Sequence, residues 1–158
     1  MKKILVICLM VFASAAWASD YEDGVAAYAK GNNEVALKKY KKAAEQGSAH
    51  AQRNLGLMYY NGVGVAQNYA EAMKWYKLAA EKGLASAQFN IGLMFDNGQG
   101  VAQDFTRAHM WYNLAAVSGD KDAVKNRDLT AARMTPKQIA QAQQLARKCT
   151  ARNFQNCD

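Results

Sequence analysis

Histidine and cysteine, the residues that most often bind metals or act as nucleophiles, are scarce in this chain. Its 158 residues include two histidines and three cysteines. His50 and His109 do not form an H-x-x-x-H or H-E-x-x-H pair, and a zinc site needs three or four converging ligands. No C-x-x-C motif is present either, so redox catalysis has no support. We therefore expect no metal, no cofactor and no catalytic residue.

Long apolar segments are also lacking, except at the N-terminus. Lys2 and Lys3 precede the apolar run Ile4–Ala16, and Ala16-Trp17-Ala18 forms an A-x-A cleavage site. These features are typical of a secretory signal peptide, and the run is too short for a membrane-spanning helix. We expect cleavage after Ala18, which gives a periplasmic or secreted protein without stable membrane insertion. An uncleaved N-terminal anchor is the alternative.

Acidic residues are outnumbered by basic ones. The formal net charge is +7, and loss of Lys2 and Lys3 with the signal peptide lowers it by two. The basic residues form no arginine-rich run and no aromatic stacking platform, so we expect no nucleic-acid partner. The charge instead favours solubility, acidic partners or an anionic envelope surface. About 140 residues remain after cleavage, which fits one domain.

The middle of the chain contains two copies of one sequence repeat. Ala51–Gly83 and Ala87–Gly119 are offset by 36 residues, and 19 of their 33 aligned positions are identical. A period of this length predicts a stacked array of repeats, each too small to bury its apolar face alone.

Each copy predicts two helices, which we call helix A and helix B. Helix A is expected at residues 49–60 and 85–96, and helix B at residues 69–83 and 105–118. Ser48, Asn68 and Asp104 are suitable N-cap residues, and Asn61-Gly62 and Asn97-Gly98 supply the turns between the helices.

Two glycines lie inside helix A, where each costs about 1 kcal/mol relative to alanine. We expect the cost of Gly56 and Gly92 to be offset by close approach of helix B at small residues such as Ala72 and Ala79. The pairs Trp75-Tyr76 and Trp111-Tyr112 are expected to fill space between successive repeats, because large aromatics at repeating helical positions are usually core residues.

Residues 19–47 form a degenerate first copy with a shorter turn. A helix is expected at residues 20–30 with Asp20 as a possible N-cap, followed by a second at residues 34–46 capped by Asn32 or Asn33. The lysines of this second helix are interpreted as a solvated face. They are Lys38, Lys39, Lys41 and Lys42.

The third copy begins at Asp120 and then departs from the pattern. Thr135-Pro136-Lys137-Gln138 combines three helix start signals, and the last helix is expected at residues 136–150. It should cap the apolar end of the array, as terminal repeats do, and cover an apolar patch at Met110 and Val117.

Cys149 and Cys157 are the two cysteines that remain after cleavage. In an oxidising compartment, two thiols near a chain end indicate a disulfide, which would connect the tail to the last helix. Two free thiols are the alternative.

The repeats resemble the Sel1-like repeat family, whose units are related to tetratricopeptide repeats but longer. Residues 134–146 are also similar to the closing helix of exported bacterial members. The resemblance implies an all-α, right-handed superhelical α-solenoid of helix-turn-helix repeats with a C-terminal capping helix, and an adaptor that binds proteins or peptides. The first copy carries the family pattern in Ala51, Gln52, Gly56, Gly62, Gly64, Val65, Ala72, Trp75, Ala79, Ala80 and Gly83, and the second carries it 36 residues later.

The sequence therefore predicts a signal peptide at residues 1–18, a degenerate repeat at 19–47, Sel1-like repeats at 48–83 and 84–119, and a partial repeat with the capping helix at 120–158. We expect a monomer that binds a protein or peptide partner.

Differences between the copies indicate a binding surface on helix A. In a helical-hairpin array, helix A normally lines the concave side, where ligands bind. Positions that differ between the copies share one face of this helix with Leu57 and Leu93. The predicted binding residues are His50, Arg53, Tyr60, Phe89 and Asp96. Ordinary exposed residues that vary freely are the alternative interpretation.

A hydrolase acting on β-lactams or cell-wall fragments is the alternative function. Some cysteine-rich relatives have been regarded as β-lactamase-like, but they carry a cysteine pair in nearly every repeat. Ser118-Gly-Asp-Lys121 fits the S-x-x-K pattern, yet the S-D-N and K-T-G partner motifs are missing. We therefore favour the adaptor.

Overall fold

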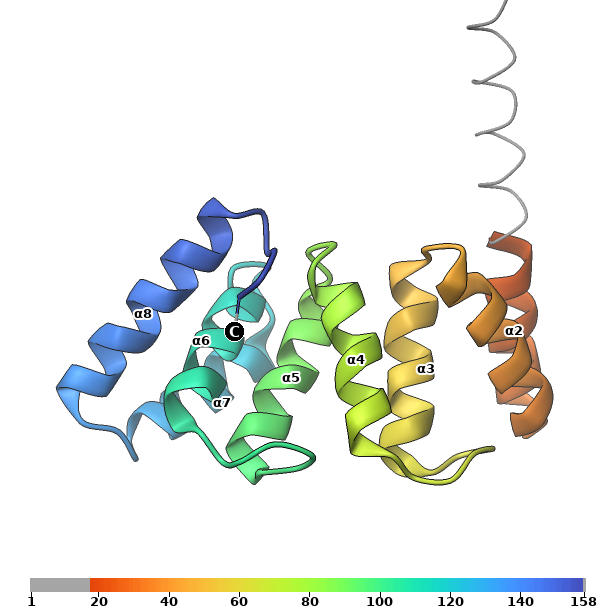
Figure 1. Ribbon diagram of the computed structural model, residues 1–158, viewed down its shortest axis with the longest axis horizontal. Coiled ribbons are helices and arrows are strands. Elements are labelled where there is room, and N and C mark those ends of the chain that lie inside the picture. Colours follow the sequence, from red (N-terminus) through yellow and green to blue (C-terminus); the bar gives the residue numbers. More distant parts are fainter. Residues whose placement is uncertain (1–17, 158) are drawn as a thin grey trace, which may run out of the picture.

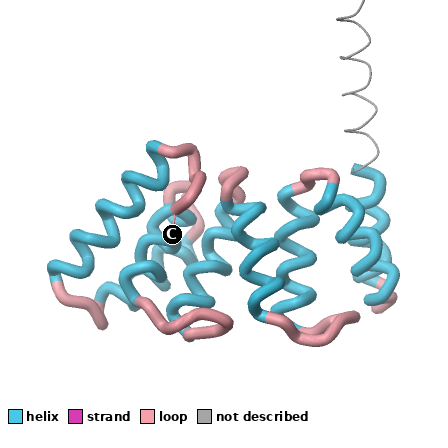
Figure 2. The backbone as a smooth tube through the Cα atoms, viewed as in Figure 1, coloured by secondary structure: helices cyan, strands magenta, loops and turns pink. Residues whose placement is uncertain are grey.

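The computed structural model describes residues 18–157, and this part of the chain contains helices, turns and loops but no strand (Figures 1 and 2). The expected signal peptide lies almost entirely outside the described residues. The first helical segment covers residues 18–29. It is followed by α2 (Asn33–Glu45), α3 (Ala49–Asn61), α4 (Tyr69–Ala80), α5 (Ala85–Asn97), α6 (Phe105–Ala116), α7 (Lys121–Ala131) and α8 (Pro136–Ala151).

The helices are arranged as a row of antiparallel pairs along the long axis of the molecule (Figure 1). Each helix from α2 to α6 packs against the next one in the chain. Helices α3 and α5 are the A helices of the two full repeats, and α4 and α6 are their B helices. The predicted all-α solenoid is confirmed.

Local signals explain where these helices begin and end. The side chains of Ser48, Asn68 and Asp104 accept hydrogen bonds from backbone N–H groups in the first turns of α3, α4 and α6. Gly62 and Gly98 end α3 and α5 in the left-handed conformation, with φ values of 69° and 67°, which costs glycine little. The predicted helices in both full repeats are therefore confirmed to within two or three residues.

The N-terminal helix differs from its prediction. Residues 18–20 are already helical, so Asp20 is inside the helix rather than its N-cap. Its buried carboxylate accepts ion pairs from Lys42 at 2.7 Å and Lys39 at 3.0 Å. Hydrogen bonds from Lys42 and then Lys39 lower the pKa of Asp20. Two of the four lysines interpreted as a solvated face therefore hold the first two helices together.

Both repeat glycines face a tyrosine of helix B. A Cβ on Gly56 would lie 2.6 Å from ring atoms of Tyr76 and 3.2 Å from the backbone oxygen of Ala72. A Cβ on Gly92 would lie 2.6 Å from the ring of Tyr112. Close approach of helix B is thus confirmed, but the closest group is an aromatic ring within the same helical pair rather than an alanine.

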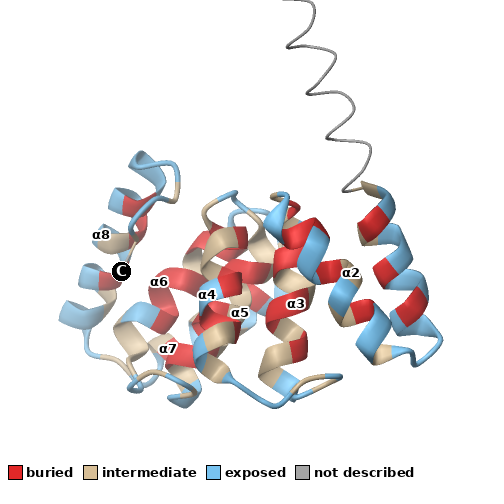
Figure 3. Ribbon diagram, turned by 45° about the vertical axis from the view of Figure 1, so that its right-hand side comes forward, coloured by how far each residue is buried: buried red, intermediate tan, exposed pale blue. Residues whose placement is uncertain are grey.

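The buried side chains form two clusters that meet at α4. The N-terminal cluster contains Leu55, Met58 and Trp75, whereas the C-terminal cluster contains Tyr76 and Ile91. Neighbouring residues on α4 therefore belong to different parts of the core. Figure 3 shows buried positions on the helix faces that meet and exposed positions on the outer faces.

The C-terminal end does not complete a third repeat. Helices α7 and α8 both pack against α6, and they make almost no contact with each other. Asp128 takes the place of Gly56 and Gly92 in the repeat register and is exposed, so no helix B ring can pack there. Met110 is buried as expected, but Val117 is 84% exposed, so the expectation that the last helix covers Val117 is wrong.

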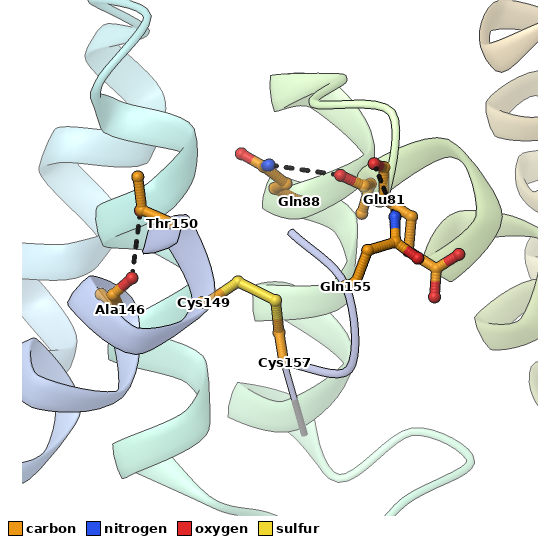
Figure 4. The surroundings of a disulfide bond; sticks show 8 residues. Glu81, Gln88, Ala146, Cys149, Thr150, Gln155 and Cys157 are labelled. Atoms are coloured by element: carbon orange, nitrogen blue, oxygen red, sulfur yellow. Dashed lines mark hydrogen bonds between the residues drawn. A yellow bond between two sulfur atoms is a disulfide. The ribbon is translucent and has the colours of Figure 1, made fainter. Parts of the chain in front are cut away.

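Helix α8 is held at both of its ends. Thr135 and Gln138 form a reciprocal capping box at its start. At the other end, Cys149 and Cys157 form a disulfide with their Cα atoms 4.9 Å apart (Figure 4), a spacing within the normal range. Between them, Gln155 donates a hydrogen bond to the backbone carbonyl of Glu81 at 3.2 Å, so the tail contacts the first full repeat.

Within residues 18–157, none of the helices combines the length and the hydropathy that crossing a membrane requires.

Candidate ligand-binding face

The first helix, α3, α5 and α7 occupy the helix A position of successive copies, and we call them the A-type helices. One face of these helices carries side chains in three rows along the array. We call it the helix A face. Its residues in each helix are spaced i, i+4 and i+7, which places them on one side of the helix. They are Tyr21, Val25 and Tyr28 in the first helix, Arg53, Leu57 and Tyr60 in α3, Phe89, Leu93 and Asp96 in α5, and Lys125, Leu129 and Ala132 at α7.

The middle row is aliphatic throughout, because it contains Val25, Leu57, Leu93 and Leu129. Val25 is 41% exposed and Leu129 is 58% exposed, although both are large apolar residues. Leu57 and Leu93 are half-buried. An aliphatic side chain thus stands at the same place in every A-type helix, and it is accessible at both ends of the row.

The N-terminal part of this face is hollowed. A groove of about 380 Å³ lies between the first helix and α3. Three tyrosines line it together with Val25, Leu57 and Arg53, which is its one charged lining residue. The tyrosines are Tyr21, Tyr28 and Tyr40.

Arg53 has few partners of its own. Its Nη1 donates to the side-chain oxygen of Asn54 at 3.1 Å, and its buried Nε has no hydrogen-bond acceptor. Among the described residues, no carboxylate forms an ion pair with it. Burial raises the pKa of the Tyr76 phenol, and the nearby Arg53 charge acts in the opposite direction. The guanidinium therefore lies close to Tyr76 without a counter-ion.

Tyr60 and Asp96 are the predicted residues closest to the C-terminal ends of α3 and α5. The Tyr60 hydroxyl hydrogen-bonds to the side-chain oxygen of Gln99, which lies in the loop after α5, and its ring meets that of Tyr69 edge-on. The Asp96 carboxylate pairs with Arg133 at 3.4 Å, just after α7. These contacts connect α3 to the second repeat and α5 to the partial repeat.

Phe89 and His50 lie on the same face but differ in exposure. The ring of Phe89 is half-buried and packs on Tyr112 at a centroid distance of 5.5 Å. His50 is exposed, and its ring lies 6.0 Å from that of Tyr21. The structure therefore places all five predicted residues on one side of the array, with each near a different part of the fold rather than in one compact cluster.

A model of the Sel1 repeat matches residues 13–48, 49–84 and 85–120 of the chain. The chain belongs to the Sel1 repeat family. Sel1 repeats generally mediate protein–protein interactions, and their solenoids generally serve as scaffolds rather than catalysts.

Two solved structures are similar to this Sel1 repeat chain. The first is c5321, a protective antigen of uropathogenic Escherichia coli with the same type of repeat fold. It is 28% identical with a TM-score of 0.82, over 89% of this chain and 31% of c5321. The second is a Sel1 repeat protein from Oxalobacter formigenes, 33% identical with a TM-score of 0.61, over 84% of this chain and 63% of that one. This chain thus spans less than two thirds of either protein. The comparison with curated proteins found no match.

Three exposed apolar residues on the helix A face were not predicted from the sequence. Val25 and Tyr28 correspond to Leu57 and Tyr60 at a spacing of 32 residues rather than 36, because the first turn between helices is shorter. Alignment at the constant repeat period misses this correspondence. Leu129 lies 36 residues after Leu93, so the period alone would have found it.

Two polar residues with catalytic side chains, His109 and Ser118, are each engaged by the fold of the Sel1 array. His109 is buried, and burial is the main cause that lowers its pKa. The Ser118 hydroxyl donates to the Ala115 carbonyl at 2.8 Å, where α6 ends. Across residues 18–157, no group of three or more histidine, cysteine, aspartate or glutamate side chains is arranged to hold a metal ion.

Proposed function

We propose that this chain is an exported Sel1 repeat adaptor that holds a peptide or an extended protein segment on its helix A face. The observation that carries the proposal is the aliphatic middle row, which repeats in every A-type helix and is exposed at Val25 and Leu129. Apolar side chains in register along a solenoid offer a continuous track to an extended chain, because neighbouring repeats present equivalent positions side by side.

The other two rows would add selectivity to this track. Aromatic and arginine side chains contribute most to binding at protein interfaces, and the face contains Tyr28, Tyr60, Phe89 and Arg53. Tyr28 is 42% exposed, whereas Phe89 packs on the core. Tyr28 is therefore the better anchor for a ligand, and Phe89 mainly supports the surface.

Site-specific photo-crosslinking in cells tests the face. A crosslinkable residue is placed at Tyr28 or Leu129 on the helix A face, and at the exposed Lys74 of helix B as a matched control. We expect a discrete adduct from Tyr28 and Leu129 and none from Lys74. Adducts from Lys74 alone would assign binding to the opposite side of the array, and no adduct at any position would remove the support for a protein partner.

The export part of the proposal rests on the N-terminal sequence. We propose cleavage after Ala18 and a periplasmic or secreted location for a protein that acts as a monomer. N-terminal sequencing of protein recovered from the periplasmic fraction should begin at Ser19, and sedimentation should give the mass of one chain. Recovery of the full-length chain from the membrane fraction would instead identify an uncleaved anchor.

A hydrolase remains the alternative, and a chromogenic cephalosporin assay tests it. We expect no turnover above that of a Ser118→Ala variant, because the Ser118 hydroxyl is engaged by a backbone carbonyl. Turnover that is lost in the variant would make the chain an enzyme.

A further inference from the structure

We infer that the groove between the first helix and α3 is a carboxylate-binding subsite, in which Arg53 receives an anionic group of a peptide while the tyrosines and aliphatic residues around it receive a neighbouring apolar side chain. This inference rests on the proposed peptide-binding function and names the chemistry that the ligand must carry.

The repeat itself shows that arginine is not needed at position 53 for folding. The equivalent residue is Tyr21 in the first helix and Phe89 in α5, and each packs on the tyrosine of its own helix B, with ring centroids 6.0 Å and 5.5 Å apart. The scaffold therefore accepts an aromatic ring here. Arg53 replaces that ring beside Tyr76 and introduces a charge that neither aromatic counterpart has, whereas Lys125 at the same place in α7 is also charged but exposed.

This charge is incompletely satisfied within the described part of the chain. A guanidinium has five N–H donors, whereas Arg53 makes one hydrogen bond, to Asn54, and leaves its buried Nε without an acceptor. A partly buried charge without a counter-ion is unfavourable. A ligand that brings an anion to the groove would relieve this cost on binding.

The groove fits a carboxylate better than other partners. It contains no aspartate or glutamate that could compete for Arg53, and a guanidinium pairs with a carboxylate through two parallel hydrogen bonds. Apart from Asn54, its remaining walls, including Val25, Leu57 and Tyr28, are apolar or aromatic. The matching ligand is an extended segment with a carboxylate next to an apolar residue. That carboxylate can come from a chain terminus or from an aspartate or glutamate side chain.

Peptide selection on the purified protein tests the inference. Two libraries of random decapeptides are used. In one the C-termini are free, and in the other both ends are fused to a carrier chain, so that no terminal carboxylate is available. The same selections are made on Arg53→Phe, which copies Phe89, and on Arg147→Gln, which removes an exposed arginine from α8 as a matched control. Thermal unfolding shows that each variant is folded, and we expect Arg53→Phe to melt no lower than the wild type.

We expect the wild type and Arg147→Gln to enrich peptides with a carboxylate beside an apolar residue. Enrichment in the free-terminus library alone would identify a chain terminus as the source, and enrichment in both would identify acidic side chains. The enriched peptides should bind Arg53→Phe about 10- to 100-fold more weakly, the range expected for a charge-assisted hydrogen-bond pair.

Two different failures can be told apart. Enriched peptides without a carboxylate preference, bound equally by Arg53→Phe, would overturn the subsite and leave the peptide-binding function standing. No enrichment from either library would count against the proposed function and the subsite together.

Discussion

At the scale of single residues, a helix A glycine in each full repeat leaves room for the ring of a helix B tyrosine, because an added Cβ would lie 2.6 Å from that ring. The same contact recurs in the degenerate copy, where a Cβ on Gly24 would lie 2.7 Å from ring atoms of Tyr40. Glycine is therefore present for space, because all three glycines lie in helices, where alanine would otherwise be preferred.

Gly92→Ala tests this contact. The substitution improves helix propensity by about 1 kcal/mol, but the new Cβ overlaps the fully buried ring of Tyr112, and overpacking typically costs about 1–3 kcal/mol. We expect urea unfolding to show a net loss of stability. In a Tyr112→Leu background the same change should be neutral or stabilising, and an equal loss in both backgrounds would show that the ring is not the cause.

His109 is the one buried histidine among the described residues, and it takes the place of Met73 in the repeat. Its folded-state pKa is lowered, first by burial and then by Arg127, while Asp128 acts in the opposite direction. The unfolded chain therefore binds the proton more readily. The stability that neutral His109 contributes is present above its unfolded pKa of about 6.5 and is lost as the pH falls below it.

We expect the free energy of unfolding of the wild type to decrease between pH 7.5 and pH 5.5, in a range where the carboxylates have not yet begun to titrate appreciably. His109→Met should reduce this decrease, because methionine is the residue that the first repeat uses at the same place. Urea unfolding at several pH values measures both proteins, and identical pH dependence would show that another group is responsible.

At the scale of elements, the C-terminal tail is an addition to the repeat pattern. The disulfide closes the chain between Cys149 and Cys157, and Phe154 and Gln155 within this loop lie against Gly83 and Glu81. The tail thus connects α8 to the turn between α4 and α5, two elements that the repeat pattern does not bring together.

Reduction of the disulfide should release this connection without unfolding the array. A cross-link of this span stabilises by about 2 kcal/mol, so exchange of backbone amides at residues 152–157 should become roughly 30-fold faster. Hydrogen exchange before and after reduction measures the effect. Gln155→Ala with the disulfide intact is the control and should change the rate much less. Unchanged exchange after reduction would mean that packing alone fixes the tail.

Most helix boundaries in the full repeats were predictable because they have a local signal, although α5 begins after Leu84 without a side-chain cap. Caps such as Asn68 and left-handed glycines such as Gly62 act within one turn of the chain, so the sequence contains the information. The partners of Asp20 were not predictable, because an ion pair between different helices depends on how they pack. The same holds for the glycine contacts, where close approach was foreseen but the tyrosine ring was not.

At the scale of the whole molecule, the candidate face was predictable only in part. The comparison of two copies identified variable positions on α3 and α5, and the structure places them on one side of the array. The comparison of the copies could not identify the groove, because the groove depends on Tyr21, Val25 and Tyr28 in a copy with a different turn length. Nor could the comparison show that Asp96 already pairs with Arg133, which leaves Arg53 and Lys125 as the charged residues of this face without an ion pair in the described part of the chain.

The two core clusters predict that a destabilising substitution in one cluster affects mainly its own end of the array. In a solenoid, each repeat contacts mainly its neighbours, so stability is approximately a sum of local terms. Leu55 and Ile91 are equivalent and fully buried, but Leu55 belongs to the N-terminal cluster and Ile91 to the C-terminal one. Leu55→Ala and Ile91→Ala should each cost about 2–5 kcal/mol through the cavity they leave.

The region that loses protection from hydrogen exchange distinguishes the two variants. Hydrogen exchange should increase mainly in residues 18–80 for Leu55→Ala, and mainly in α5, α6 and the C-terminal helices for Ile91→Ala. The C-terminal cluster is the larger one and includes residues of α8, so it should remain protected when the N-terminal cluster opens. Uniform loss of protection in both variants would show instead that the array unfolds as one cooperative unit, with α4 transmitting the damage from one cluster to the other.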